Sequence, residues 1–527
     1  MKNGFVSKCV VPDNKIQILF LVVLLAAYGF TSGPSLVSGQ EKESDRFEWQ
    51  QQDIPENARW RLGAPKGDFD LPGFVDLEFS HSGNLLAIKD HRHRIHFLNL
   101  KEKKLQSIAE SKDVKRVAFA PDDSAIIVLS TRGVSTWLTQ TGKLGDSLGV
   151  SANHVAAQLD RPGFVITRSQ KSVSYPWPLP NDKSGRTIPT GLVGSRAGSR
   201  AINHNGTLSL FSDGKSYELH DLQKGVHKPL KIKSRLRLVK LSNDRTMMNV
   251  LPNQSTIELW DLDNPSRFVL EGNTNYIDAD FSRDGRFIYA IDRKMQVVIW
   301  DLTTLQIAAV FSGHLDRINA ITASPEFLCM ATCSSGTRDR SVVFWDVNKV
   351  LFPEIEMDAD FTLSEVLKDL GSKNVGPSLQ ATNKLYRHLD ADPKLAGLLI
   401  AELDLKRPNL VAEQLIKELD DKNFQVREKA TRRLSGMVND IRGRLLDVRK
   451  QCSSEAEWRI DKILETKTSK SYFVSFEGRR AIRILLALEL AASPSAKKAL
   501  ANLQASHEDP QIRQKAADIL KRLNRKQ

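Results

Sequence analysis

The stretch Gly313–Asp346 reads GHLDRINAITASPEFLCMATCSSGTRDRSVVFWD. It opens on Gly-His and closes on Trp-Asp, and the strand-forming run SVVF stands directly before the tryptophan. Runs rich in β-branched and aromatic residues, separated by turn-forming residues, predict several short strands within this stretch. One such unit cannot form a domain by itself, so we searched the rest of the chain for copies of it.

The end of this stretch recurs toward the N-terminus at intervals of about 40 residues. Ile257–Asp261 and Val297–Asp301 end as Val342–Asp346 does, with a Trp-Asp pair after three residues of a predicted strand. Degenerate copies extend back to residue 80. The residues at the tryptophan position are Leu98, Trp137, Trp177, His220, Trp260, Trp300 and Trp345, spaced by 39, 40, 43, 40, 40 and 45 residues.

Turn-forming pairs keep the same period. They precede each of the first six positions by about 14 or 15 residues, and such pairs favour tight hairpins because they tolerate positive φ. The pairs are Ser82-Gly83, Asp122-Asp123, Pro162-Gly163, Asn205-Gly206, Asp244-Arg245 and Asp284-Gly285. In the seventh copy Pro325-Glu326 stands 19 residues ahead, so we expect an enlarged loop over Cys333–Arg338.

Two landmarks with one period predict seven copies over residues 59–353. A unit of short strands that cannot cover its own apolar faces must stack on its neighbours, and seven such units close a ring. We therefore predict an all-β, seven-bladed propeller. Arg59–Leu62 is a plausible outer strand that closes the ring against the last copy.

The Gly-His opening and the Trp-Asp ending resemble those of the WD40 family, most clearly in copies five to seven. Copies one to four also fit other propellers, such as TolB-like domains. In WD40 blades a buried histidine, a serine or threonine, an aspartate and the tryptophan form a hydrogen-bonded set. The resemblance implies this structural, non-catalytic role for His314, Thr332, Asp339 and Trp345. The other structural positions that it implies are Asp346, Trp300, Asp301, Trp260, Asp261 and Trp137.

Beyond residue 354 the apolar period changes from two residues to 3.6, which predicts an all-α region over 354–527. The predicted helices are Phe361–Leu370, Ser378–Leu389, Pro393–Leu403, Leu410–Leu419, Phe424–Val438, Ile441–Lys450, Glu455–Glu465, Arg479–Ala492, Pro494–Leu503 and Pro510–Leu523.

Two of these helices share a pattern similar to that of HEAT repeats. Arg427 and Arg513 each follow an apolar residue, with alanine three positions and leucine seven positions further on. We expect both arginines to be solvated or paired with a nearby aspartate. The whole arrangement, a degenerate propeller followed by helices that carry the string Phe424–Ala430, resembles exported WD40 proteins of planctomycete bacteria.

The first 39 residues follow a secretory pattern. Three lysines precede the apolar run Ile16–Phe30, which is short for a spanning helix, and Val37 and Gly39 suit a cleavage site. An uncleaved signal anchor is the alternative. Both predict an exported protein, periplasmic or otherwise extracytoplasmic, and the second adds a membrane anchor through residues 16–30. The polar segment 40–58 is predicted to be an exposed linker.

The net charge of +13 favours anionic partners, although a generally basic surface without a dedicated ligand explains it as well. Of the four cysteines, Cys329 and Cys333 lie about 13 Å apart on one predicted strand, which is too far for a disulfide. Cys452 has no evident mate. These three are expected to be small buried apolar side chains.

No catalytic motif, cofactor-binding motif or metal-ligand spacing occurs, so we predict no catalytic residue, no cofactor and no metal site. His91, His93 and His96 could place two ligands on one strand face. Their arginine neighbours favour a solvated loop instead. Aromatic residues do not alternate with basic runs, and a nucleic-acid partner is not expected.

We therefore predict an exported, non-catalytic scaffold that binds other proteins through the propeller loops and the helical tail. The first alternative is a hydrolase or lyase that acts on an extracellular polymer, with acidic, histidine or tyrosine side chains at the mouth of the propeller channel. The second is a basic protein that binds polyanions or anionic envelope polymers.

Overall fold

The computed structural model describes most of the chain from residue 47 onward. The signal or anchor segment predicted over 1–39 and most of the segment 40–58 lie outside the described residues. Within the described part, no helix is both long and apolar enough to cross a membrane. The described ranges are 47–49, 54–63, 72–108, 113–150, 152–158, 163–167, 171–179, 183–189, 198–213, 215–232, 236–243, 245–251, 254–262, 266–325, 328–356, 361–404, 410–449, 451–464, 476–507 and 509–525.

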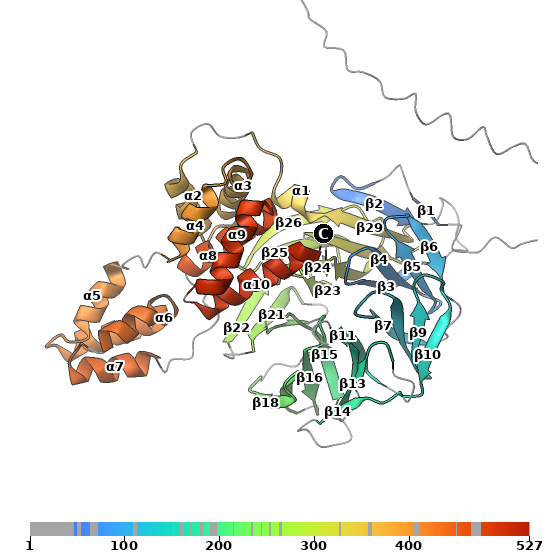
Figure 1. Cartoon of the computed structure of the whole chain (residues 1–527), viewed down its shortest axis with the longest axis horizontal. Coiled ribbons are helices and arrows are strands. Elements are labelled where there is room, and N and C mark those ends of the chain that lie inside the picture. Colours follow the sequence, from blue (N-terminus) through green and yellow to red (C-terminus); the bar gives the residue numbers. More distant parts are fainter. Residues whose placement is uncertain are drawn as a thin grey trace, which may run out of the picture. The chain divides into compact units, whose positions relative to one another are not determined.

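Seven antiparallel sheets follow one another along the chain, and each forms one blade of a propeller (Figure 1). Blade 1 contains β3 (Phe74–Phe79), β4 (Leu85–Asp90), β5 (Ile95–Asn99) and β6 (Lys104–Ser107). Blade 2 contains β7 (Val114–Phe119), β8 (Ala125–Ser130), β9 (Gly133–Leu138) and β10 (Leu144–Leu148). Blade 3 contains β11 (His154–Gln158), β12 (Gly163–Thr167), β13 (Lys171–Pro176) and β14 (Arg186–Pro189).

The remaining four blades repeat this order. Blade 4 contains β15 (Gly198–Ile202), β16 (Leu208–Ser212), β17 (Tyr217–Asp221) and β18 (Val226–Leu230). Blade 5 contains β19 (Leu238–Leu241), β20 (Thr246–Val250), β21 (Thr256–Asp261) and β22 (Ser266–Glu271). Blade 6 contains β23 (Tyr276–Phe281), β24 (Phe287–Asp292), β25 (Gln296–Asp301) and β26 (Gln306–Ser312). Blade 7 contains β27 (Ile318–Ala323), β28 (Cys329–Ser334) and β29 (Ser341–Asp346), with β2 (Ala58–Gly63) and β1 (Glu48–Trp49) from the N-terminal side.

The first strand of each blade contacts the first strands of both neighbouring blades, and β27 contacts β3, so the ring is closed. The predicted outer strand is confirmed, since β2 pairs antiparallel with β29 from Ala58–Trp345 to Gly63–Ser341. The prediction of an exposed linker over 40–58 is wrong for 47–49 and Ala58, whereas 54–57 are exposed or half-buried. Strand β1 pairs with β2, which begins at Ala58, and Phe47 is buried among apolar side chains of blades 1 and 7.

Where they are described, the predicted hairpin tips connect the first and second strands of their blades; Pro162, Asp244 and Glu326 lie outside the described residues. Gly83, Asp123, Gly206, Arg245 and Gly285 all have positive φ, between 59° and 76°. This is the backbone conformation that the turn-forming pairs were expected to supply. In blade 7 the enlarged loop covers 335–340, because Cys333 and Ser334 still belong to β28.

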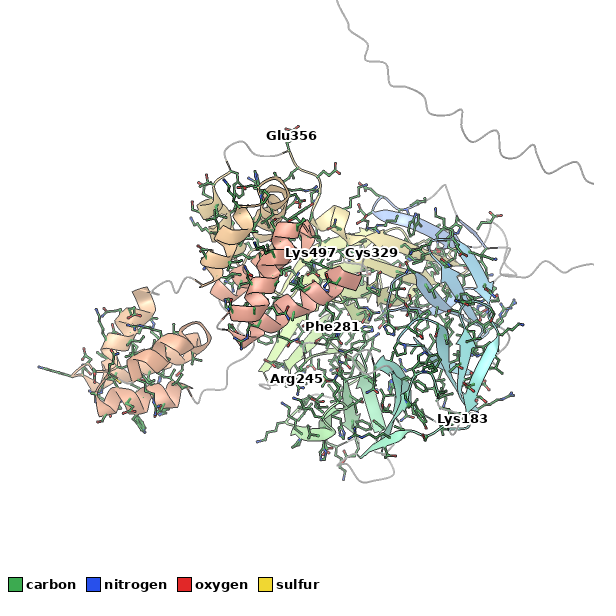
Figure 2. The ribbon with its side chains drawn as sticks, in the orientation of Figure 1. Lys183, Arg245, Phe281, Cys329, Glu356 and Lys497 are labelled. Atoms are coloured by element: carbon green, nitrogen blue, oxygen red, sulfur yellow. The ribbon has the colours of Figure 1, made fainter. Side chains whose placement is uncertain are left out.

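Buried apolar residues fill the spaces between neighbouring blades, as stacking requires. One cluster joins blades 1 and 7, and another joins blades 5 and 6 around Phe281 and Trp300. Figure 2 shows Phe281 inside the fold, whereas Lys183 and Glu356 project at its periphery. Cys329 and Cys333 are buried, Cys452 is half-buried, and all three are free thiols.

Helices follow the last blade without a break. They are α1 (Val347–Leu351), α2 (Leu363–Leu370), α3 (Val375–Ala391), α4 (Leu395–Asp404), α5 (Leu410–Glu418), α6 (Phe424–Arg449), α7 (Ser454–Leu464), α8 (Phe476–Ala491), α9 (Pro494–Ser506) and α10 (Pro510–Arg525). The short α1 was not predicted. The predicted break between Val438 and Ile441 is wrong. Leu434, Val438, Ile441 and Leu445 are all buried and spaced by three or four residues, so one apolar stripe continues along a single helix.

The two HEAT-like helices are built alike. The Arg427 guanidinium donates to the carbonyl of Asp421 at 2.7 Å, and that of Arg513 donates to the carbonyl of His507 at 2.5 Å. Each arginine thus binds the backbone six residues earlier, whereas the sequence predicted solvent or an aspartate side chain. The alanine three positions further on, Ala430 or Ala516, is fully buried and leaves room for a neighbouring helix.

The helical region forms two apolar clusters. Helices α5, α6 and α7 share one core of their own. The other helices share a core with blades 6 and 7 that includes Trp345, Leu351 and Leu485. Helix α8 packs against α3 and also contacts α4, so α5–α7 is an insertion between α4 and α8, which contact each other.

Two buried ionic contacts fasten this second group of helices to blade 6. Arg483 of α8 binds Asp301 and donates to Thr303 Oγ1 at 3.0 Å, and both charged side chains are about 1% exposed. Glu489, also on α8, accepts from Arg286 in the hairpin tip of blade 6 at 3.1 Å and from Arg522 of α10 at 2.7 Å. We call these contacts the helix seam.

We predict that Arg483→Met will destabilise the chain by about 3 kcal/mol, because it leaves the Asp301 carboxylate buried without its cation. Urea unfolding followed by circular dichroism measures this loss. Arg432→Met on α6, where the side chain is 80% exposed, is the matched control and should change stability by less than about 0.5 kcal/mol. Equal stability of the two variants would contradict a structural role for the seam.

Candidate functional site

The structure brings the four residues of the blade 7 set into one hydrogen-bonded chain. Trp345 Nε1 donates to Thr332 Oγ1 at 2.7 Å, and Thr332 Oγ1 lies 2.7 Å from His314 Nε2. His314 Nδ1 lies 2.7 Å from Asp339 Oδ2. Because Trp345 occupies an acceptor position of the hydroxyl, Thr332 can donate its own hydrogen to His314, which then donates to Asp339.

Asp339 collects further donors that the sequence did not indicate. It accepts from the backbone N–H of Leu315 at 2.9 Å and from Ser341 Oγ at 2.5 Å. Arg61 of β2 forms an ion pair with it at 3.0 Å. Burial raises the pKa of Asp339, but the hydrogen bond from His314 and the Arg61 charge outweigh it and lower that pKa to about 2.

The hydrogen-bonded series Thr332, His314 and Asp339 resembles a hydrolytic triad in its order of groups. The burial of these side chains argues against catalysis. Thr332 is fully buried, and the side chains of His314 and Asp339 have no exposed area. A nucleophile must reach its substrate, and this hydroxyl is enclosed between strands and already accepts from Trp345. The set therefore fixes the turn before β27 to the body of the blade.

The other tryptophans use different partners. Trp300 Nε1 donates to the Tyr276 hydroxyl at 3.2 Å, and Trp137 Nε1 donates to Ser135 Oγ at 3.2 Å. The buried indole N–H of Trp260 has no hydrogen-bond partner within the described part of the chain. A complete set of histidine, hydroxyl, aspartate and tryptophan is thus formed in blade 7. In blades 5 and 6, Trp260 and Trp300 are held by apolar packing, to which Trp300 adds its hydrogen bond to Tyr276.

The aspartates that follow the tryptophans connect the blades to other elements. Asp346 accepts from the N–H of Lys349 at the start of α1 and pairs with Arg59 at 2.9 Å. Asp301 belongs to the helix seam. Asp261 is buried beside its own blade turn. Two of these three residues therefore attach flanking segments to the ring, a role that the repeat pattern alone did not indicate.

The prediction of a solvated loop at His91, His93 and His96 is correct for the first two and wrong for the third. His91 and His93 are exposed, whereas His96 is fully buried in β5. His96 Nε2 lies 3.1 Å from Asp90 Oδ2, and Nδ1 lies 2.8 Å from Ser107 Oγ. His96 lies inside the blade because β5 is buried on both faces from Ile95 to Leu98. In the described residues, no metal-binding group of His, Cys, Asp and Glu residues is found.

Charged side chains meet inside the ring, where the sequence had placed no site. His204, from the hairpin tip of blade 4, lies 3.8 Å from Glu78 Oε1 of blade 1 and 3.5 Å from Asp280 Oδ1 of blade 6. Lys240 of blade 5 lies 3.9 Å from the same Asp280 oxygen. Four blades thus contribute to one group near the ends of the innermost strands, which we call the channel cluster.

Two aspartates of β23 in this cluster have opposite electrostatic environments. Burial raises the pKa of Asp280, but the Lys240 ammonium and His204 outweigh it and hold that pKa far below its usual range. Burial raises the pKa of Asp278 to about 6, and the Asp280 charge adds to the rise although Lys240 opposes it. Because residues two apart on a strand share a face, an ionised and a readily protonated carboxyl stand side by side.

Other members of the channel cluster are shifted as well. Burial raises the pKa of Asp76 in blade 1, although Arg116 and Lys240 counteract it. Burial lowers the pKa of His204, but Asp280 and Glu78 outweigh this and raise it overall. Such opposing shifts within one enclosed group are a recognised feature of functional sites, although structural ion-pair networks produce them too.

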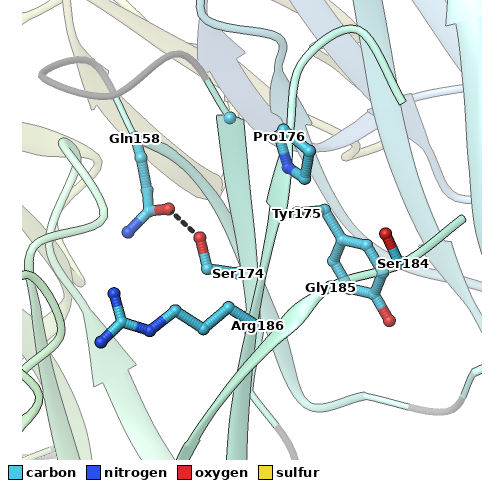
Figure 3. A pocket seen from close by; sticks show the side chains of 8 residues that line it. Gln158, Ser174, Tyr175, Pro176, Ser184, Gly185 and Arg186 are labelled. Carbon is cyan, nitrogen blue, oxygen red and sulfur yellow. Dashed lines mark hydrogen bonds between the residues drawn. The ribbon is translucent and has the colours of Figure 1, made fainter. Parts of the chain in front are cut away.

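A separate pocket of about 370 Å³ lies at the end of blade 3 (Figure 3). Ser174 of β13 donates to Gln158 Oε1 of β11 at 2.5 Å within it. The lining residues are Gln158, Gly163, Ser174, Tyr175, Pro176, Ser184, Gly185 and Arg186. Among the described residues, this lining has one cation and no carboxylate or histidine, so they offer binding groups but no acid–base pair.

Comparison with known proteins agrees with the repeat. Residues 305–346 match the family model described as WD domain, G-beta repeat, and this range covers β26 to β29. The chain therefore contains a WD repeat within a seven-bladed propeller, followed by a helical region. The β-propeller domain of Cps50 (Swd1) from Myceliophteria thermophila is a similar solved structure, with 13% identity and a TM-score of 0.43, over 52% of this chain and 97% of that one. No curated protein matches the sequence.

We predict that Asp339→Asn will lower the free energy of unfolding by about 2 kcal/mol at neutral pH, which follows from the depressed pKa. A depressed carboxyl pKa stabilises the fold above the ordinary value near pH 4, and this stabilisation is lost as the pH falls toward 2. The difference between wild type and variant should therefore shrink below about pH 4. Urea unfolding at a series of pH values measures it.

Asp146→Asn is the matched control, because Asp146 lies exposed on β10. This variant should follow the wild type at every pH. A difference for Asp339→Asn that stays constant between pH 7 and pH 3 would show that the carboxylate charge does not stabilise the blade 7 set.

Proposed function

We propose that this protein is an exported, non-catalytic scaffold that binds other proteins. WD40 propellers are typical of protein-interaction scaffolds, and residues 305–346 match the repeat. The observation that carries the proposal is the helix seam. Arg483 and Glu489 of α8 hold helices to turns of blade 6, so that propeller turns and helices are presented together.

The hairpin-tip end of the strands is the proposed docking face. The tip of blade 6 and the turn after Asp301 lie at this end and bind the helices. The tips of blades 1 and 2 carry exposed or half-buried polar residues such as Ser82 and Asp122. Loops on a rigid ring are where binding residues of such folds concentrate, because their backbones are positioned by the strands beneath them.

Export belongs to the same proposal. The apolar run Ile16–Phe30 behind three lysines supports an extracytoplasmic location, either as a cleaved signal or as an anchor. The positive net charge supports an acidic partner or an anionic surface nearby.

We predict that a photo-crosslinking residue at Ser82 will capture a stoichiometric protein partner in native envelope, whereas one at Lys294 will not. Ser82 lies in the hairpin tip of blade 1. Lys294 lies in blade 6, in the turn between β24 and β25, at the end of the strands opposite the hairpin tips. The measurement is mass spectrometry of the crosslinked products of the full chain. Truncation at residue 354 is unsuitable, because it would expose the apolar core that blades 6 and 7 share with the helices.

Equal labelling from both positions would contradict docking on the hairpin-tip face. Recovery of polysaccharide without protein would contradict the scaffold proposal and favour a polyanion-binding protein.

The channel cluster favours a second candidate function, hydrolysis or lysis of an extracellular polymer. Asp278 would donate a proton as a general acid, and ionised Asp280 would stabilise positive charge or act as a base. Because Asp278 is protonated only below its pKa of about 6, this activity would fall as the pH rises through 6.

In that case we predict that Asp278→Asn will abolish release of reducing ends or unsaturated products from acidic polysaccharides without unfolding the chain. Because burial disfavours the charged form of Asp278, the melting temperature of Asp278→Asn at pH 8 should equal or exceed that of the wild type. Asp146→Asn is again the control. Wild-type protein that releases no product between pH 5 and pH 8 would exclude this candidate for the polymers tested.

A further inference from the structure

The pocket on blade 3 contains a cation, Arg186, that has no partner among the described residues. Arg186 opens β14, and its guanidinium forms no ion pair or hydrogen bond with any residue in the described part of the chain. Figure 3 shows it on the same side of the sheet as Gln158 and Ser174. The register explains this, because Arg186 and Ser174 are directly paired across β13 and β14.

The remaining polar groups of the pocket are neutral. Gln158, which is 7% exposed, accepts from Ser174 and donates one amide hydrogen to the Gly206 carbonyl at 3.4 Å. Its second amide hydrogen has no such partner in the part of the chain that the structure describes. A guanidinium and a second amide hydrogen, with no carboxylate among the described lining residues, are complementary to the two oxygens of one carboxylate.

Two glycines shape the pocket. A Cβ at Gly185 would lie 2.7 Å from a Val173 methyl and 2.8 Å from the Tyr175 ring. A Cβ at Gly163 would lie 2.4 Å from the Tyr175 carbonyl. The absence of side chains at these positions lets the chain pass close to Tyr175, whose ring stacks on Phe164 at 5.3 Å. The Tyr175 ring lies on the face of the sheet opposite Ser174 and Arg186, so packing on that face holds the strands that carry the pocket.

The pocket adjoins a free sheet edge. Blade 3 has the strand order β11-β12-β13-β14, so the outer edge of β14 has no strand partner among the described residues. An extended peptide can add to such an edge through backbone hydrogen bonds, and alternate side chains then reach pockets beside it. Thr187 next to Arg186 is also exposed, which keeps this edge accessible.

We propose that blade 3 binds an extended acidic peptide, which pairs with the edge of β14 and places a glutamate or aspartate carboxylate on Arg186. This assignment rests on the proposed scaffold function and names the chemistry of one partner segment. A phosphate group is a poorer match, because phosphate recognition by side chains uses clusters of arginines and this pocket has one.

The test uses the full chain and a fluorescein-labelled peptide Val-Thr-Glu-Val-Thr, with Val-Thr-Gln-Val-Thr as the neutral control. Fluorescence polarisation at low ionic strength measures affinity. We expect the glutamate peptide to bind at least about tenfold more tightly than the glutamine peptide, which is the usual effect of one charge-assisted hydrogen-bond pair. Added salt should weaken the binding.

Two protein variants locate the interaction. Arg186→Gln should remove the preference for glutamate, whereas Arg132→Gln, at an exposed arginine in the turn between β8 and β9, should retain it. Both side chains are exposed, so the melting temperatures of the variants should equal that of the wild type.

The proposal is overturned if the two peptides bind equally, if Arg186→Gln leaves the preference unchanged, or if neither peptide binds. It is also overturned if a uronic-acid disaccharide, and not the peptide, binds in an Arg186-dependent way. Capture of a partner by the crosslinker at Ser82 would persist in each of these cases if the scaffold function is correct, so the two failures can be distinguished.

Discussion

The pairing of β2 with β29 completes the last blade of the ring, and the ion pair between Arg61 and Asp339 joins the two strands. Asp339 also receives hydrogen bonds from His314, Leu315 and Ser341, so a single carboxylate joins the N-terminal strand, the loop before β27 and the last strand. Without β2, the last blade would lose its outer strand and expose the edge of β29. An open edge of this kind invites pairing with other chains.

Much of the ring was predictable because its determinants are local. A hairpin tip requires positive φ at one residue, and Asp-Gly or Asn-Gly pairs reveal that requirement directly, as at Gly206 and Gly285. The strand before a Trp-Asp pair is equally local. The positions equivalent to this tryptophan, from Leu98 to Trp345, therefore keep a regular spacing that can be recognised even where another residue replaces the tryptophan. The break predicted within α6 failed for a related reason, since polar residues between Val438 and Ile441 interrupted a stripe that continues beneath them.

The channel cluster and the helix seam were invisible in the sequence because their members are distant along the chain. Glu78, His204 and Asp280 stand in three different repeats, and each looks like an ordinary polar residue near a turn. Arg483 lies 182 residues from Asp301, and only the packing of α8 brings them together. His96 was misread for a local reason, because His91 and His93 lie in the exposed turn, whereas His96 already belongs to β5, which is buried on both faces.

The closing strand also has a consequence for the order in which the protein is made. β2 is synthesised before any blade, yet Arg61 must wait for Ser341, 280 residues later, before its site is complete. Contacts of such long sequence separation form slowly, because the intervening chain has to be ordered first. A chain that leaves the ribosome from its N-terminus therefore carries β2 without its partner β29 through nearly the whole assembly of the ring. During this interval the edge of β2 that later pairs with β29 is open to association with other unfinished chains.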